Sequence, residues 1–105
     1  MSQRTMLILK ECAPVFSVLQ DENRQKILME LFDHGEMNVL EITDRMELSR
    51  PAVSHHLKLL LSAGVVSVRK EGKENYYKVE LEDAVVLVRT LLESLEADMK
   101  REKAT

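Results

Sequence analysis

The sequence has few of the residues from which small proteins build covalent links and aromatic platforms. It contains one cysteine, Cys12, two phenylalanines, two tyrosines and no tryptophan. A single cysteine excludes an internal disulfide and a zinc site made from paired cysteines of one chain, and it fits a reducing compartment. So few aromatic rings argue against a platform on which single-stranded nucleic acid stacks its bases.

Long hydrophobic runs are also missing. No apolar stretch is long enough to span a membrane. The stretch from Met6 to Leu9 is interrupted by Lys10 and Glu11, so it cannot serve as the core of a signal peptide. We therefore expect a cytoplasmic protein that has no membrane partner.

Glycine and histidine are scarce, with three residues of each type. These residues and Cys12 supply no nucleophile with a neighbouring base, no phosphate-binding glycine loop and no metal cluster. We expect neither an enzyme nor a protein with a metal or cofactor. A length of 105 residues, 45% hydrophobic and 31% charged, suits a single globular domain over residues 1–105.

The charges are unevenly distributed. The net charge is −3, which by itself argues against a polyanionic partner. The segment from Arg45 to Lys78, however, contains seven basic and three acidic residues, so its net charge is +4. The rest of the chain has eight basic and fifteen acidic residues, a balance of −7. An acidic body with one basic stretch is typical of a protein that directs that stretch toward phosphates.

Apolar spacing predicts three helices in the first half of the chain. The first covers residues 5–19, and Pro14 should kink or divide it. The second begins after Asp21 as its N-cap, places Phe32 and three aliphatic residues at helical spacing, and ends at Gly35. The third is short, from an Asn38 cap to about residue 47.

The second half predicts a helix, a hairpin and a long final helix. Ser49 caps the fourth helix, Pro51 occupies its first turn and Gly64 follows its end. Residues 65–69 and 75–79 have strand character, with a tight turn at residues 72–73. The final helix covers residues 82–103 and carries an apolar seam at spacings of three and four: Val85, Val88, Leu92, Leu95 and Met99. The predicted class is mainly α with a small β-hairpin.

The fourth helix has two chemically distinct faces. At about 100° per residue, one face is apolar: Ala52, Val53, Leu57, Leu60 and Ala63. The opposite face carries small and hydrogen-bonding residues without a carboxylate: Pro51, Ser54, His55, Lys58 and Ser62. Such groups suit base edges and phosphates. Two short helices followed by a basic hairpin predict a helix-turn-helix with a wing, whose second helix enters the major groove of DNA.

The chain resembles the ArsR/SmtB-type winged-helix transcriptional repressors between about residues 21 and 79. The matching segments are residues 23–28 (NRQKIL), 48–60 (LSRPAVSHHLKLL), 63–66 (AGVV) and 69–73 (RKEGK), followed by Tyr76 and Tyr77. In that family the first and last helices pair two subunits, and the dimer binds an inverted-repeat operator to block transcription. The resemblance therefore implies a homodimeric winged-helix repressor.

The metal motifs of that family are missing here. Metal-sensing members carry Cys-x-Cys in the third helix, where this chain has Asn38 and Leu40. Other members bind zinc through Asp and His on the last helix, but no histidine follows His56, and Asp83 alone is no site. We therefore expect no metal site, and no small-molecule or metal effector is evident.

Two sets of candidate residues follow. The predicted DNA-binding residues are Ser49, Arg50, Pro51, Ser54, His55, Lys58, Arg69, Lys70, Lys73 and Tyr77. The predicted dimer interface consists of Leu9, Cys12, Phe16, Val88, Leu92, Leu95 and Met99. Tyr76 and Tyr77 point to opposite faces of their strand, so one should pack beneath the hairpin while the other touches phosphate.

Alternatives stay open at this point. The winged helix could be a protein-interaction module whose acidic exterior binds a basic partner. Cys12 could make the repressor redox-responsive, although a free cysteine in an apolar helix is more often a core residue. His55 and His56 point about 100° apart and cannot chelate one ion together. We interpret His56 as a packed imidazole with one hydrogen bond, and His34 as a favourable charge at a helix end.

Overall fold

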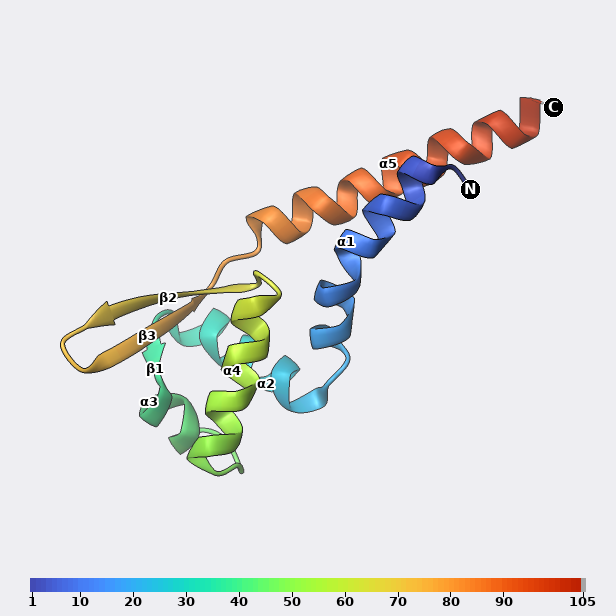
Figure 1. Ribbon diagram of the computed structural model, residues 1–105. Coiled ribbons are helices and arrows are strands. Elements are labelled where there is room, and N and C mark those ends of the chain that lie inside the picture. Colours follow the sequence, from blue (N-terminus) through green and yellow to red (C-terminus); the bar gives the residue numbers. More distant parts are fainter. Residues whose placement is uncertain (105) are drawn as a thin grey trace.

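The computed structural model describes residues 1–104. The elements in chain order are α1 (Gln3–Leu19), α2 (Glu22–His34), β1 (Met37–Asn38), α3 (Val39–Asp44), α4 (Arg50–Ser62), β2 (Val66–Glu71), β3 (Glu74–Val79) and α5 (Glu82–Ala104). Residues 21–79 form a winged head, whereas α1 and α5 lie side by side and project from it as an arm (Figure 1). The molecule is accordingly elongated, at 58 × 25 × 21 Å.

The head folds around one hydrophobic core. Its most deeply enclosed side chains are at most 2% exposed and come from α2, α3, α4 and the start of the hairpin: Ile27, Leu31, Ile42, Val53, Leu57, Leu60 and Val65. These residues recur at helical spacing within each helix, so each helix buries one stripe. Burial of this stripe on α4 sets which side of the helix remains accessible.

Side-chain caps define where the head helices begin. The Asp21 carboxylate accepts a hydrogen bond from the Arg24 amide at 3.1 Å, and the Ser49 hydroxyl accepts one from the Ala52 amide at 3.3 Å. Asn38 and Glu41 form a reciprocal capping box at the start of α3. All three predicted caps are confirmed.

Two predicted helix boundaries are wrong. Of the two predicted effects of Pro14, division of the helix does not occur, since α1 is one helix from Gln3 to Leu19, whereas a kink stays a prediction. Lys10 and Pro14 are both exposed, so water can reach the carbonyl group that the proline leaves without an amide partner. The third helix ends at Asp44 rather than near residue 47, because the Arg45 amide bonds the Ile42 carbonyl in a tighter turn.

The sheet has one more strand than predicted. Its order is β1-β3-β2, and the two residues of β1 pair antiparallel with β3, Met37 with Tyr77 and Asn38 with Tyr76. A strand of two residues has no periodicity to detect. The predicted hairpin is confirmed and extends to Glu71 and Glu74 around Gly72, whose positive φ of 61° suits glycine.

The arm has its own small core and a polar end. Ile8, Cys12 and Leu91 are buried between α1 and α5. Beyond them Thr5 and Ser94 are buried and share a short hydrogen bond. The Asp98 carboxylate accepts hydrogen bonds from the Ser2 amide at 2.9 Å and the Thr5 hydroxyl at 2.7 Å. These bonds tie the first turn of α1 to the last third of α5.

Asp98 makes the stability of the arm depend on pH. Hydrogen bonds from the Ser2 amide, the Thr5 hydroxyl and Arg101 hold the pKa of the Asp98 carboxyl well below its usual range. The folded state therefore favours the ionised form. Its stabilising contribution is complete above the ordinary carboxyl pKa of about 3.9 and is lost as the pH falls toward the depressed value.

We expect Asp98→Asn to lower the thermal unfolding midpoint at pH 7, because the amide makes weaker hydrogen bonds than a carboxylate. The difference from the wild type should narrow below about pH 4, because the Asp98 carboxyl of the unfolded chain then begins to bind protons while that of the folded protein stays ionised. Differential scanning calorimetry at pH 7 and below pH 4 measures the unfolding midpoints of the two proteins. Glu96→Gln, an exposed position on the same helix, is the matched control. An equal loss in the two variants would contradict this role.

Candidate nucleic-acid interface

The exposed face of α4 is the one predicted from its sequence. Val53, Leu57 and Leu60 are fully buried, which locks the rotation of the helix against α2, α3 and β2. The opposite face is exposed and consists of five residues: Pro51, Ser54, His55, Lys58 and Ser62. A helix anchored in this way presents its hydrogen-bonding groups as one surface that an approaching ligand can contact.

The start of α4 favours an anion. Its first turn contains no acidic residue, and Arg50 is exposed at its first position. The positive end of the helix dipole and the Arg50 guanidinium therefore add to each other. Within residues 1–104, Arg50 and Lys58 take part in no ion pair, so both charges are available to phosphates. Ser49 is exposed, but its hydroxyl is engaged as the helix cap.

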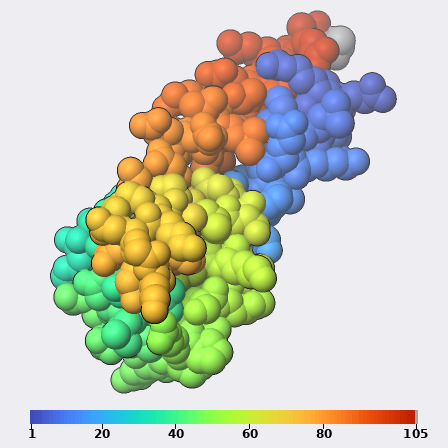
Figure 2. Space-filling view, turned by 60° about the vertical axis from the view of Figure 1, so that its left-hand side comes forward, coloured from blue at the N-terminus to red at the C-terminus, as the bar shows by residue number. Residues whose placement is uncertain are grey.

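The hairpin is the wing of the head. It extends away from the helices in Figure 1 and stands in front of the head in Figure 2, and β2 contacts α4. Lys70 and Lys73 lie near its tip, both are exposed, and neither forms an ion pair within the part of the chain that is described. The predicted cationic wing thus has two unpaired lysines.

Arg69 has acidic partners that the sequence did not indicate. Its guanidinium donates two hydrogen bonds to Glu36, from Nε at 3.1 Å and from Nη2 at 3.0 Å, and lies 3.5 Å from Glu71. These carboxylates, Glu36 first, raise the pKa of the guanidinium, and Arg69 lowers the pKa of Glu36. Arg69 is therefore paired within the protein, and phosphate binding by Arg69 stays a prediction.

The tyrosine prediction also needs correction. Tyr77 packs against the core of the head, so it is the ring beneath the hairpin. Tyr76 lies on the other face of β3, where the Arg69 guanidinium sits 5.1 Å from its ring centroid. The two tyrosines do point to opposite faces, but Tyr76 is on the outer one.

His56 has a structural environment, as interpreted from the sequence. It is half-buried, and its Nδ1 lies 3.3 Å from Nη1 of Arg24, which donates to it. Arg24 also donates from Nε to the Val18 carbonyl at 2.8 Å. Arg24 of α2 thereby joins the end of α1 to α4, and the sequence pattern did not indicate this contact.

Part of the predicted dimer interface is exposed. Four of its residues are accessible on the arm: Leu9, Phe16, Leu92 and Met99. Val88 and Leu95 are half-buried beside the small arm core. Cys12 is 0% exposed, and its Sγ lies 3.8 Å from the Leu87 carbonyl of its own chain. Its assignment to the interface is therefore wrong, because α1 and α5 of one subunit already enclose it.

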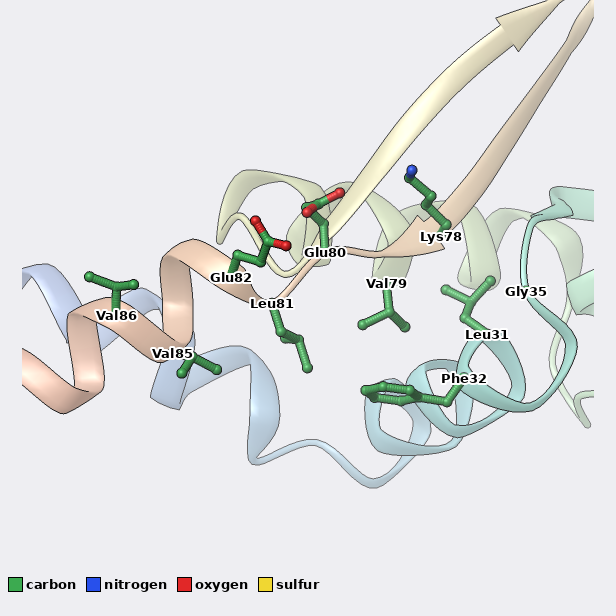
Figure 3. Close-up of a pocket in the computed structure, with 10 residues that line it drawn as sticks. All are labelled: Leu31, Phe32, Gly35, Lys78, Val79, Glu80, Leu81, Glu82, Val85 and Val86. Carbon is green, nitrogen blue, oxygen red and sulfur yellow. The ribbon is translucent and has the colours of Figure 1, made fainter.

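An apolar groove that the sequence did not indicate lies where the head meets the arm. It has a volume of about 750 Å³ and is bordered by the end of α2, the end of β3 and the start of α5. Phe32 lies below Val79, and Leu81 and Val85 extend toward the same space (Figure 3). Phe32 follows the buried residues of α2 at helical spacing but is itself 62% exposed. Leu81 and Val85 also line a second hollow between α1 and α5.

Two further findings concern the described residues 1–104. No group of three His, Cys, Asp or Glu side chains is placed to hold a metal ion. None of the helices combines the length and the apolar character needed to cross a bilayer.

The three helices of the head, with α4 exposing its polar face beside a lysine-bearing hairpin, define a winged helix-turn-helix protein. Proteins of this class read double-stranded DNA with the second helix of the motif. The sequence model of the bacterial regulatory protein, arsR family, matches residues 21–68.

Known proteins resemble the chain over most of its length. It is 36% identical to an uncharacterized HTH-type transcriptional regulator of Methanocaldococcus jannaschii over 82% of this chain and 96% of that protein. It is 35% identical to the transcriptional repressor SdpR of Bacillus subtilis over 68% of this chain and 81% of that protein. A solved homodimeric winged helix-turn-helix domain from Mycobacterium bovis matches with a TM-score of 0.70 and 31% identity, over 93% of this chain and 88% of that one. The chain belongs to the ArsR family and is a DNA-binding transcriptional regulator.

The burial of Cys12 makes its chemistry testable. Burial, with Glu11 nearby, raises the pKa of the thiol above its usual value, so little thiolate forms at neutral pH. We expect Cys12 to react with a colorimetric disulfide reagent slowly in the folded protein and rapidly in denaturant. The matched control is Cys12→Ala combined with Ala13→Cys, which moves the thiol to the exposed neighbouring position. Equally fast labelling of both folded proteins would contradict this burial.

Proposed function

We propose that this protein is a homodimeric repressor whose two heads bind the half-sites of an inverted-repeat operator. The proposal rests on one observation above all: the polar face of α4 is exposed beside unpaired cations of α4 and the wing. The chain acts in the cytoplasm as one folded unit, without catalytic activity and without a bound cofactor. The resemblance to a transcriptional repressor and to a homodimeric domain supports this assignment.

The arm supplies the surface for pairing. Val85, Leu92 and Met99 are 47%, 53% and 56% exposed and recur every seven residues along α5. The half-buried Val88 and Leu95 lie between them at the alternate spacing, which is the pattern of a helix that packs against a partner helix. Leu9 and Phe16 add exposed apolar area on α1. A second copy related by two-fold symmetry would cover both helices.

Each head would place α4 in the major groove. Ser54 and His55 lie on the exposed face, where they can hydrogen-bond to base edges. Arg50, Lys58, Lys70 and Lys73 would bind phosphates on either side, while Ser49 and Pro51 set the approach of the helix end to the backbone. With two-fold symmetry, the two helices reach grooves separated by about 34 to 36 Å, one turn of DNA.

Repression follows from occupancy. A dimer bound across an operator covers the duplex that the transcription machinery needs, so no further activity is required of the protein. The buried Cys12 does not favour oxidation as the control of binding, and we propose neither a metal nor a small-molecule effector. Expression level or a protein partner would then regulate occupancy.

Dimer formation can be tested through the arm. We expect Leu92→Asp to shift the protein from dimer to monomer at micromolar concentration, because it places a charge in the centre of the apolar seam. Sedimentation velocity measures the change. Val86→Asp is the matched control, since Val86 is also exposed on α5 but does not belong to the seam of residues spaced three and four apart. A wild-type protein that sediments as a monomer would overturn the dimer.

Base reading can be tested on α4. We expect Ser54→Ala and His55→Ala to weaken binding to the selected operator by about 1 to 3 kcal/mol while leaving binding to random duplex nearly unchanged. Operators are first selected from a random pool, and fluorescence anisotropy then measures both affinities. Ser62→Ala, a hydroxyl loss at the other end of the same helix, is the control. Equal weakening on both duplexes would reject the assigned reading role, and no binding by the wild type would favour a protein-interaction module.

A further inference from the structure

The side chain of one arginine reaches from β2 across β3 to the residue that precedes β1. Arg69 of β2 is paired in register with Tyr76 of β3, and Tyr76 is paired with Asn38 of β1. The guanidinium lies 5.1 Å from the Tyr76 ring centroid and donates two hydrogen bonds to Glu36, the residue directly before β1. We call Glu36, Arg69 and Tyr76 the wing clamp.

The clamp uses the charge of Arg69 within the protein. A bidentate carboxylate is the geometry that guanidinium binds best, and Glu71 lies 3.5 Å from its third nitrogen. A DNA phosphate would have to displace Glu36 to gain the same two bonds. Lys70 and Lys73 have no such competitor within residues 1–104, so they are the wing groups that are free to bind phosphate.

The clamp connects the wing to the reading helix. Glu36 is followed by β1, and Asn38 at the end of β1 caps α3. Helix α3 packs against α4. The bond to Glu36 therefore fixes the position of the wing relative to α3, the first helix of the helix-turn-helix. It thereby also fixes the distance between the lysines of the wing and the exposed face of α4.

We propose that Glu36 and Arg69 are positioning residues for DNA binding: they orient the wing so that Lys70 and Lys73 meet the backbone while α4 lies in the groove. This proposal rests on the proposed function, since it assumes that the wing and α4 contact one duplex. It also changes the role of an acidic residue. Glu36 supports binding to a polyanion, although its charge alone would oppose it.

The salt dependence of binding separates positioning from phosphate contact. The slope of log K against log salt changes by about 0.9 for each phosphate contact, so by about 1.8 for a contact made by both subunits. We expect Glu36→Gln and Arg69→Gln each to weaken operator binding by about fivefold per subunit, with the slope unchanged. Lys73→Gln should instead make the slope shallower by about 1.8 per dimer.

Two controls sharpen the comparison. Glu74→Gln removes one negative charge from an exposed wing position that forms no ion pair within residues 1–104, and so calibrates the general effect of charge. Glu36→Arg combined with Arg69→Glu restores the pair with its charges exchanged and should recover most of the lost affinity. The Nε–H signal of Arg69 in an NMR spectrum should persist when operator DNA is added to the wild type, because Glu36 keeps its bond.

Opposite outcomes would overturn the clamp. If Glu36→Gln binds more tightly than Glu74→Gln with a slope steeper by about 1.8, Glu36 competes with DNA for Arg69. If Arg69→Gln makes the slope shallower by that amount, or the charge exchange recovers nothing, Arg69 contacts phosphate directly. Failure of the wild type to prefer any duplex would overturn the proposed function instead. The clamp could then still be tested without DNA: the Arg69 Nε–H signal should be present in the wild type and lost in Glu36→Gln.

Discussion

Burial of one stripe of α4 is the constraint on which the rest of this structure depends. Val53, Leu57 and Leu60 have no exposed surface, so the helix cannot rotate without exposing aliphatic area to water. Ser54, His55 and Lys58 must then face outward as a set. The hydrophobic effect has no direction of its own, yet here it orients the polar groups that we propose read DNA, because a helix has only one side left once the other is packed.

The basic residues of the head differ in whether they have an acidic partner. The chain has a net charge of −3, but the cations on the exposed face of α4 and at the wing tip have no carboxylate partner within residues 1–104. Arg69, in contrast, is neutralised by Glu36 and Glu71 and serves the shape of the wing. A count of basic residues treats these groups alike. Only their partners show which charges are available to phosphate.

The arm and the head have separate hydrophobic cores. The arm core is small, and the hydrogen bonds around Asp98 hold α1 on α5 where apolar area is lacking. The seam along α5 remains exposed, as does the groove that Phe32 lines between arm and head. Pairing of two arms would bury the seam and fix the separation of the two heads, so assembly and DNA reading would be linked through α5.

The order of the helices and the hairpin, the helix caps and the two faces of α4 could be predicted from the sequence, because caps and helical periodicity are local. The family could be identified from contiguous words between residues 21 and 79. Neither local pattern nor resemblance indicated that Arg69 binds Glu36, that Tyr77 rather than Tyr76 packs inward, or that Cys12 is enclosed within its own subunit. Each depends on contacts between residues distant in the chain: a third strand too short to have a period, and the rotation of α1 against α5. Tertiary structure decided those, since only packing places distant side chains within reach of one another.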